Sequence, residues 1–178
     1  MMSTSLYLVP DQADDNAANR RTGLWVFMGV VGMLFFLFSC AYVMRMGLPD
    51  WRPLPFVPWQ LWLSTALLAA AGVAWRRGAV GWGCVLSLAF LASQLWAWRA
   101  ADFALGANPA NSFFYLITGL HALHVAGGLV VAAGARRSRS MVQLCARYWH
   151  FMLVLWLAMF GLLFRVTPEL VRQVCDAF

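Results

Sequence analysis

Three histidines are the residues of this sequence best suited to chemistry, because an imidazole can bind a metal or a haem iron and can carry a proton. His121 and His124 lie in one apolar stretch, and His150 lies at the start of the next. A spacing of three places His121 and His124 on one face of a helix, and Thr118 extends this polar face by a turn. Two interpretations follow: a haem or metal held by His121 or His124 together with His150, or a set of hydrogen bonds between helices.

The depth of these histidines favours hydrogen bonds between helices. Measured from the same end of the two stretches, His124 lies about 11 residues, roughly 16 Å, from the boundary, and His150 only roughly 4 Å. The two imidazoles then differ in depth by about 12 Å, whereas an iron or zinc ion needs nitrogen ligands about 2 Å away. We therefore expect structural histidines, with no catalytic residue and no cofactor or metal bound by this chain.

The four cysteines do not form a metal-binding or disulfide pattern. Cys40, Cys84, Cys145 and Cys175 share no Cys-x-x-Cys spacing. Cys40 and Cys84 fall inside apolar stretches, where a cysteine usually acts as a small buried residue. The sequence therefore predicts free thiols without a role in chemistry.

Five apolar stretches are long enough to place these residues inside a membrane. The chain has 178 residues, of which 62% are hydrophobic and 11% charged, whereas about a quarter of a soluble domain is charged. A transmembrane helix needs about 20 mainly apolar residues. The stretches cover residues 24–44, 59–75, 80–98, 113–135 and 148–166. They lack the alternation of a membrane β-barrel strand, so the sequence predicts an all-α, polytopic membrane protein built as a bundle of five transmembrane helices.

The charged residues lie around these stretches and predict an orientation. All seven carboxylates fall outside the spans, which argues against a transporter or proton relay. All thirteen basic residues are arginines, eight on the side of the N-terminus and five on the other. This bias predicts a cytoplasmic N-terminus and a periplasmic C-terminus. The arginines form no continuous stripe, so we expect contacts with membrane lipids and not with nucleic acid.

The predicted spans divide the chain into three parts. Residues 1–23 are expected to form a polar N-terminal tail, residues 24–166 the membrane domain, and residues 167–178 a short C-terminal tail.

Several motifs in the membrane domain also occur together in one known family. They are GLPDWRP (47–53), LWLST (61–65), Gln94 with Trp98, FFYLITGLHALHVAGG (113–128) and RYWHF (147–151) followed by Trp156. In these motifs the chain resembles subunit III of the haem–copper oxidases, from about Gly23 to Phe164. Five spans resemble the short bacterial form of that family.

This resemblance implies a subunit without haem or copper, placed beside subunits I and II of a terminal oxidase, cytochrome c oxidase in the first instance. Such a subunit belongs to the bacterial inner membrane, supports assembly, stability and proton uptake in aerobic respiration, and can hold phospholipid. The residues that the family motif marks as structural are Gln94, Thr118, Gly119, His121, His124, Gly128, Trp149, His150 and Trp156. The alternatives are an accessory subunit of a quinol oxidase or a nitric oxide reductase and, from another class, a small b-type haem membrane protein or a transporter.

The chain departs from the family pattern at three positions that commonly carry carboxylates. Val31 and Ala97 stand where relatives usually have glutamate, and Leu153 where they often have aspartate. These replacements remove the carboxylates that a direct role in proton uptake would use.

Overall fold

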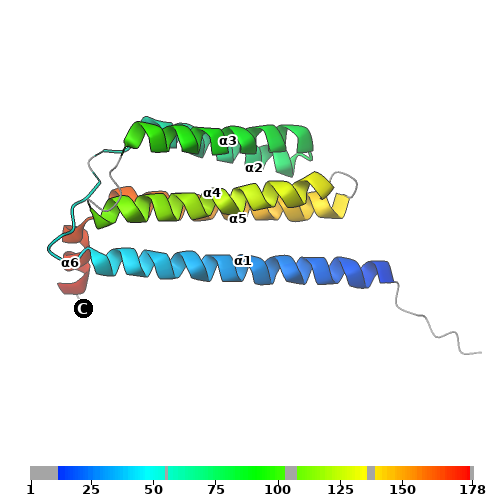
Figure 1. Cartoon of the computed structure of the whole chain (residues 1–178). Helices are drawn as coiled ribbons and strands as arrows, with labels where there is room; N and C mark the ends of the chain where they lie inside the picture. Colours follow the sequence, from blue (N-terminus) through cyan, green and yellow to red (C-terminus); the bar gives the residue numbers. More distant parts are fainter. Residues whose placement is uncertain (1–11, 55, 103–107, 136–138, 177–178) are drawn as a thin grey trace, which may run out of the picture.

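The computed structural model describes residues 12–54, 56–102, 108–135 and 139–176 of the chain (Figure 1). All the regular secondary structure in this part of the chain is helical. Its helices are α1 (Gln12–Arg45), α2 (Trp59–Arg76), α3 (Val80–Ala101), α4 (Pro109–Ala135), α5 (Arg139–Arg165) and α6 (Pro168–Asp176). The prediction of an all-α protein is therefore confirmed.

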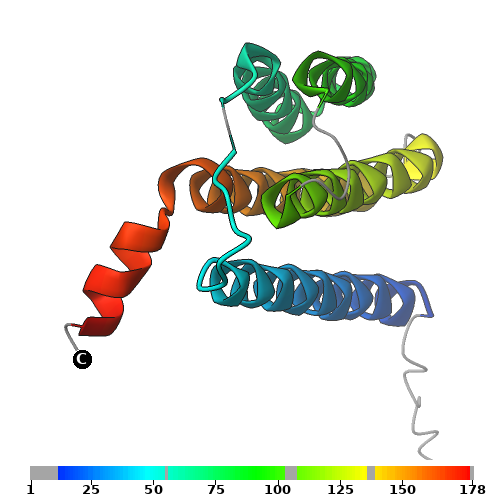
Figure 2. The same cartoon turned by 60° about the vertical axis from the view of Figure 1, so that its left-hand side comes forward.

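The five long helices pack side by side in three layers (Figures 1 and 2). Helices α4 and α5 form the middle layer and contact each other. Helices α2 and α3 cover one side of this layer, where α2 packs on α5 and α3 on α4. Helix α1 packs on the opposite side, against both α4 and α5. The middle layer therefore holds the bundle together.

Four helical stretches of the described residues are long and apolar enough to cross a membrane, so the predicted number of five spans is not exact. They are Ala18–Arg45, Val80–Ala101, Pro109–Gly134 and Arg139–Arg165. The predicted span at 59–75 forms α2, which has 18 residues. Those residues include Gln60, Ser64, Thr65 and Arg76, and α2 is not among the four stretches. The chain is nevertheless a multi-pass helical membrane protein.

Both predicted tails contain helix. Helix α1 begins at Gln12, so residues 12–23 continue the first span; no proline or glycine between Pro10 and Gly23 interrupts the helix. Residues 1–11 lie outside the described residues. At the other end Pro168 starts α6, where Thr167 Oγ1 accepts a hydrogen bond from the backbone N–H of Leu170 at 3.4 Å. Residues 12–23 of the polar N-terminal segment and residues 168–176 of the C-terminal segment are therefore helical.

The two ends of the bundle carry different numbers of arginines. One end of the bundle contains the start of α1, the turn between α2 and α3, the end of α4 and the start of α5 (Figure 1). Helix α6 lies at the other end. The described arginines at the first end are Arg20, Arg21, Arg76, Arg77, Arg139 and Arg147. Those at the second end are Arg45, Arg52, Arg99, Arg165 and Arg172 of α6. The predicted grouping of arginines is thus a property of the fold, while the orientation in the membrane stays a prediction.

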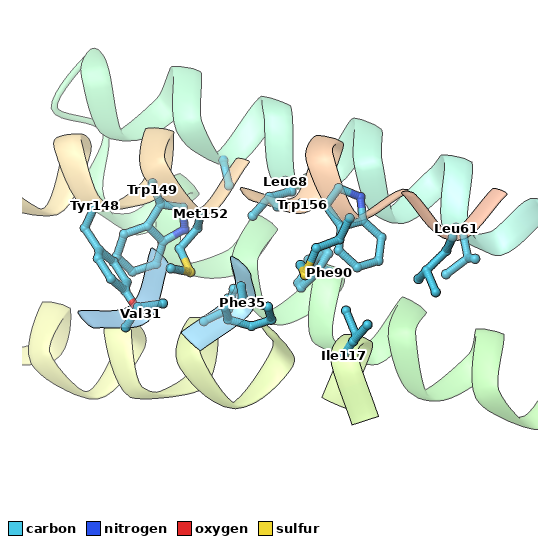
Figure 3. Packing of buried hydrophobic residues seen from close by; sticks show 14 of the residues in the cluster. Val31, Phe35, Leu61, Leu68, Phe90, Ile117, Tyr148, Trp149, Met152 and Trp156 are labelled. Carbon is cyan, nitrogen blue, oxygen red and sulfur yellow. The ribbon is translucent and has the colours of Figure 1, made fainter. Parts of the chain in front are cut away.

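The core consists mainly of large aromatic and aliphatic side chains from all five long helices (Figure 3). Trp149 and Trp156 of α5 lie at its centre and are almost fully buried. Outside the core, large apolar side chains face outward; Val130 is 76% exposed and Trp82 is 68% exposed. An apolar outer surface around an aromatic interior fits a bundle whose surroundings are lipid.

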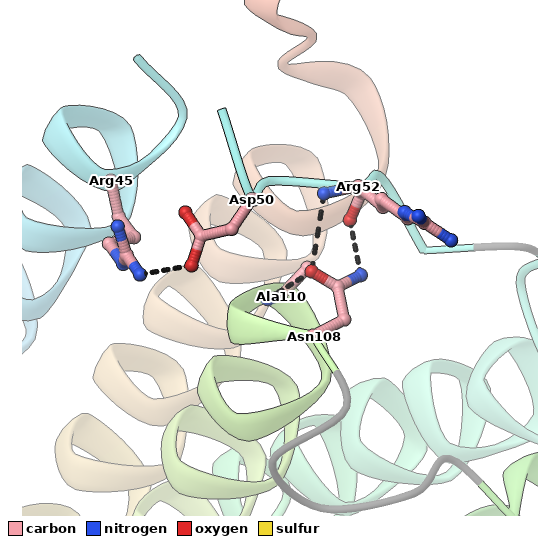
Figure 4. Close-up of polar contacts among 5 residues, drawn as sticks. All are labelled: Arg45, Asp50, Arg52, Asn108 and Ala110. Carbon is pink, nitrogen blue, oxygen red and sulfur yellow. Dashed lines mark hydrogen bonds and ion pairs between the residues drawn. The ribbon is translucent and has the colours of Figure 1, made fainter. Parts of the chain in front are cut away.

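A polar cluster closes the end of the bundle where α1 leads into α2 (Figure 4). The Asn108 side chain accepts hydrogen bonds from the backbone N–H groups of Arg52 and Ala110, both at 3.2 Å. Its amide nitrogen also donates to the carbonyl of Arg52 at 2.5 Å. Arg45 and Asp50 form an ion pair beside it. Asn108 thus caps α4 and fixes the connector to the start of that helix.

Candidate functional site

Two tryptophans of α5 bind hydroxyl groups on the neighbouring layer. Trp149 Nε1 donates to Ser87 Oγ of α3 at 2.6 Å, and Trp156 Nε1 donates to Thr65 Oγ1 of α2 at 2.8 Å. Each hydroxyl in turn donates to a carbonyl four residues earlier in its own helix, at 2.7 and 2.8 Å. A hydroxyl can donate and accept at once, so all the polar atoms of these two bonds are satisfied without water.

A third bond of this kind joins α3 to α4. Trp98 Nε1 donates to Thr118 Oγ1 at 3.1 Å, and Thr118 donates to the carbonyl of Phe114 at 2.5 Å. Gly119 lies beneath the same indole, because a Cβ atom there would be 3.5 Å from Trp98. We call these contacts the three tryptophan–hydroxyl bonds. They connect α5, α2, α3 and α4 by directional hydrogen bonds, in addition to the apolar packing between these helices.

Helices α4 and α5 approach each other closely at Gly128. A Cβ atom at this position would lie 2.5 Å from Tyr148 and 3.3 Å from Trp149. The Tyr148 hydroxyl donates to the backbone carbonyl of His124 at 2.8 Å. His124 Nδ1 donates to the carbonyl of Leu120, one turn earlier, at 2.7 Å. Gly128 and His124 thus serve the contact between the two middle helices.

His121 lies in an aromatic enclosure and is fully buried. Its ring centroid is 5.1 Å from that of Trp156, 5.8 Å from Phe90 and 6.3 Å from Phe35. Neither ring nitrogen has a hydrogen-bond partner among the described residues. The spacing of the histidines predicted a shared face with His124, but the polar contacts of the two residues differ: His124 has a backbone partner and His121 has none.

His150 lies at the arginine-rich end and contacts α2. Its Nδ1 donates to the carbonyl of Ala146 at 2.7 Å, so its Nε2 is the acceptor for Arg76 Nη1 of α2 at 3.5 Å. His121, His124 and His150 therefore have different partners. Within the described part of the chain, no three histidine, cysteine or acidic side chains gather where they could hold a metal ion.

Gln94, like His121, is a motif residue whose polar side-chain atoms have no hydrogen-bond partner among the described residues. It lies on α3 and is 1% exposed, and neither its amide oxygen nor its amide nitrogen has a hydrogen-bond partner among the described residues. Sequence reasoning placed Gln94 correctly inside a helix but had no means of finding this lack of partners.

A groove of about 740 Å³ opens between α1, α4 and α5. Its walls are almost entirely apolar and include Leu24 and Phe27 of α1, Gly127 and Val131 of α4, and Leu144 of α5. Arg20, His124 and Tyr148 supply its polar groups. We call it the α1–α4–α5 groove. Sequence reasoning missed it; the signal was the pair Gly127 and Gly128, which leaves two successive positions of α4 in the groove wall without side chains.

The known proteins that the chain resembles share one name, cytochrome c oxidase subunit 3. The chain is 27% identical to cytochrome c oxidase subunit 3 of Synechocystis sp. over 82% of its own length and 75% of that protein. It is 27% identical to cytochrome c oxidase subunit 3 of Thermostichus vulcanus over 88% of its length and 92% of that protein. The corresponding protein of Alkalihalophilus pseudofirmus is 26% identical over 87% of this chain and 90% of its own. No family model matches the chain.

Proposed function

We propose that this chain, a subunit III of the haem–copper oxidase family, is a non-catalytic subunit that supports the assembly and stability of a cytochrome c oxidase. The observation that carries this proposal is the set of three tryptophan–hydroxyl bonds, which uses the motif residues Trp149, Trp156, Trp98 and Thr118 for contacts between helices. Side chains committed in this way stabilise a fold and are not available for reaction with a substrate.

The partners we propose are subunits I and II of the same complex, which would hold the haem and copper. The exposed apolar side chains support this, because helix α1 alone presents Trp25 and Phe36 with more than half of each side chain exposed. Such a surface needs lipid or another membrane protein against it. Copurification with a larger haem-bearing membrane protein is the expected result.

A phospholipid is the ligand that we propose for the α1–α4–α5 groove. The groove is apolar along its walls, as an acyl chain requires, and Arg20 lies at the arginine-rich end, where a phosphate group would be attracted. With the N-terminus in the cytoplasm of a bacterium, this end faces the inner leaflet of the plasma membrane. Reporter fusions to the two termini would test that orientation.

A role in proton uptake would be indirect in this chain. Val31 and Ala97, which replace carboxylates common in the family, are 2% and 0% exposed in the core, and Leu153 packs against the core. None of these side chains can carry a proton. We therefore propose that the chain keeps the catalytic subunit in a conformation that takes up protons and does not itself deliver them.

The test is to compare the oxidase purified with and without this chain. We expect the haem and copper content per catalytic subunit to stay the same, while the enzyme lacking the chain loses activity sooner during turnover and dissociates at a lower temperature. A purified chain that shows a Soret band with stoichiometric haem would contradict a non-catalytic subunit. Equal durability of the two preparations would contradict the supporting role.

A further inference from the structure

Two polar side chains of the core, Gln94 and His121, have four hydrogen-bonding atoms without partners. They are 1% and 0% exposed, and neither the amide of Gln94 nor the imidazole of His121 bonds to any described residue. Inside a membrane no bulk water can reach such atoms, so each one left unpaired lowers the stability of the fold. Native proteins seldom leave buried polar atoms in this state, and ordered water is a common partner.

The contacts of α3 with α4 place the two side chains at the same junction. Phe90, Gln94 and Trp98 follow each other at intervals of four on α3 and therefore share one face. The Phe90 ring contacts the His121 ring at 5.8 Å between centroids, and Trp98 bonds to Thr118 one turn before His121. Both neighbours of Gln94 on this face thus contact α4, one at His121 and one at Thr118, and we infer from this that the Gln94 side chain lies between these two contacts.

We infer that an enclosed water molecule bridges Gln94 and His121 between α3, α4 and α5. A water molecule donates two hydrogen bonds and accepts two, so it can bond to the amide oxygen or nitrogen and to either ring nitrogen. Two uncharged side chains are a suitable set of partners for water. A metal ion would need further ligands, and within the described residues no third histidine, cysteine or carboxylate joins them.

The surroundings of His121 explain why the occupant would be a water molecule and not a larger polar ligand. Phe35, Phe90 and Trp156 surround His121 with apolar rings, which offer no bond to a larger polar ligand. Thr118 and Trp98 already satisfy each other. A bridging water would therefore have Gln94 and His121 as its main partners and would hold α3 at a fixed position on α4.

The direct test is a density map of the intact oxidase complex at a resolution that shows ordered waters. We expect a water peak at about 2.7–3.2 Å from an amide atom of Gln94 and from a ring nitrogen of His121. A direct hydrogen bond between the two side chains, separate partners for each, or the absence of density between them would overturn the inference.

A thermodynamic test uses Gln94→Leu and His121→Phe, singly and together, in the same complex. Each single variant leaves the other residue and the water poorly paired, so we expect its melting temperature to fall by about 2–4 °C. The double variant removes both polar side chains that the water would bond to. Its melting temperature should therefore fall by less than the sum of the decreases in the two single variants. Additive falls would overturn the shared site. Gln143→Leu, at an exposed glutamine of α5, is the control and should cause no shift. If a variant prevents assembly, the density of the unmodified complex still decides.

Discussion

The indole nitrogen of Trp149 lies 2.6 Å from the hydroxyl of Ser87, and this bond joins α5 to α3 where both side chains are almost completely buried. Trp149 belongs to the motif that relates this chain to its family, whereas Ser87 is an ordinary residue of an apolar helix. A motif residue and an unremarked one thus form one structural unit. The stability of the bundle should depend on both.

The substitution Ser87→Ala should destabilise the chain although it removes only the hydroxyl group of one side chain. It leaves the buried indole N–H of Trp149 without an acceptor, which costs about 1–3 kcal/mol. Thermal dissociation of the purified complex measures the loss. Ser112→Ala, at an exposed serine of α4, is the control and should cause almost no change. Equal effects of the two substitutions would show that the bond to Trp149 contributes nothing.

Neighbouring glycines of α4 should respond in opposite directions to alanine. A Cβ atom at Gly128 would lie 2.5 Å from Tyr148, whereas one at Gly127 meets nothing within 4 Å. Gly127→Ala should be neutral or stabilising by up to about 1 kcal/mol, because alanine favours helix. Gly128→Ala should push α5 away from α4 and cost about 1–3 kcal/mol. Chemical or thermal unfolding of the two variants side by side checks the difference, and equal stabilities would contradict the close contact.

The cap on α4 offers a graded test at the other end of the bundle. Asn108→Ala removes the two bonds that the side chain accepts and the one that it donates, so we expect a loss of about 1–2 kcal/mol. Asn108→Asp retains the acceptors and loses the donor, so its effect should be smaller. The rate of proteolysis in the connector between α1 and α2 is a suitable readout. A larger effect of aspartate than of alanine would contradict the capping role.

Much of the fold could be predicted because a membrane-spanning helix can be recognised in a sequence by its length and apolar composition. The segments that became α3, α4 and α5 were found this way. Helix α2 shows the limit of predicting spans from composition, because its 18 residues include polar and basic positions. Its place in the bundle depends on packing against α3 and α5. Residues 12–23 show another limit, since a polar composition does not distinguish a tail from the continuation of a helix.

The candidate site could be predicted only in part, because a pattern names residues but not their partners. The depth argument separated His150 from the other histidines, and the structure gives it Arg76 as a partner from another helix. That Ser87 and Thr65 would accept bonds from tryptophans could not be read from the sequence, because it depends on how α5 rotates against α2 and α3. The missing partners of Gln94 and His121 depend on the same packing.

The proposed lipid site predicts different effects for two adjacent arginines. Arg20 lines the α1–α4–α5 groove and Arg21 does not. A basic side chain near a membrane surface contributes about 1 kcal/mol to the binding of an anionic lipid, so Arg20→Met should lower the phospholipid retained by the purified complex about fivefold. Arg21→Met changes the net charge equally and should retain the lipid of the unmodified complex. Mass spectrometry of the lipids that copurify provides the measurement. An equal loss in both variants would show that the arginines attract lipid by general charge and that the groove is not its binding site.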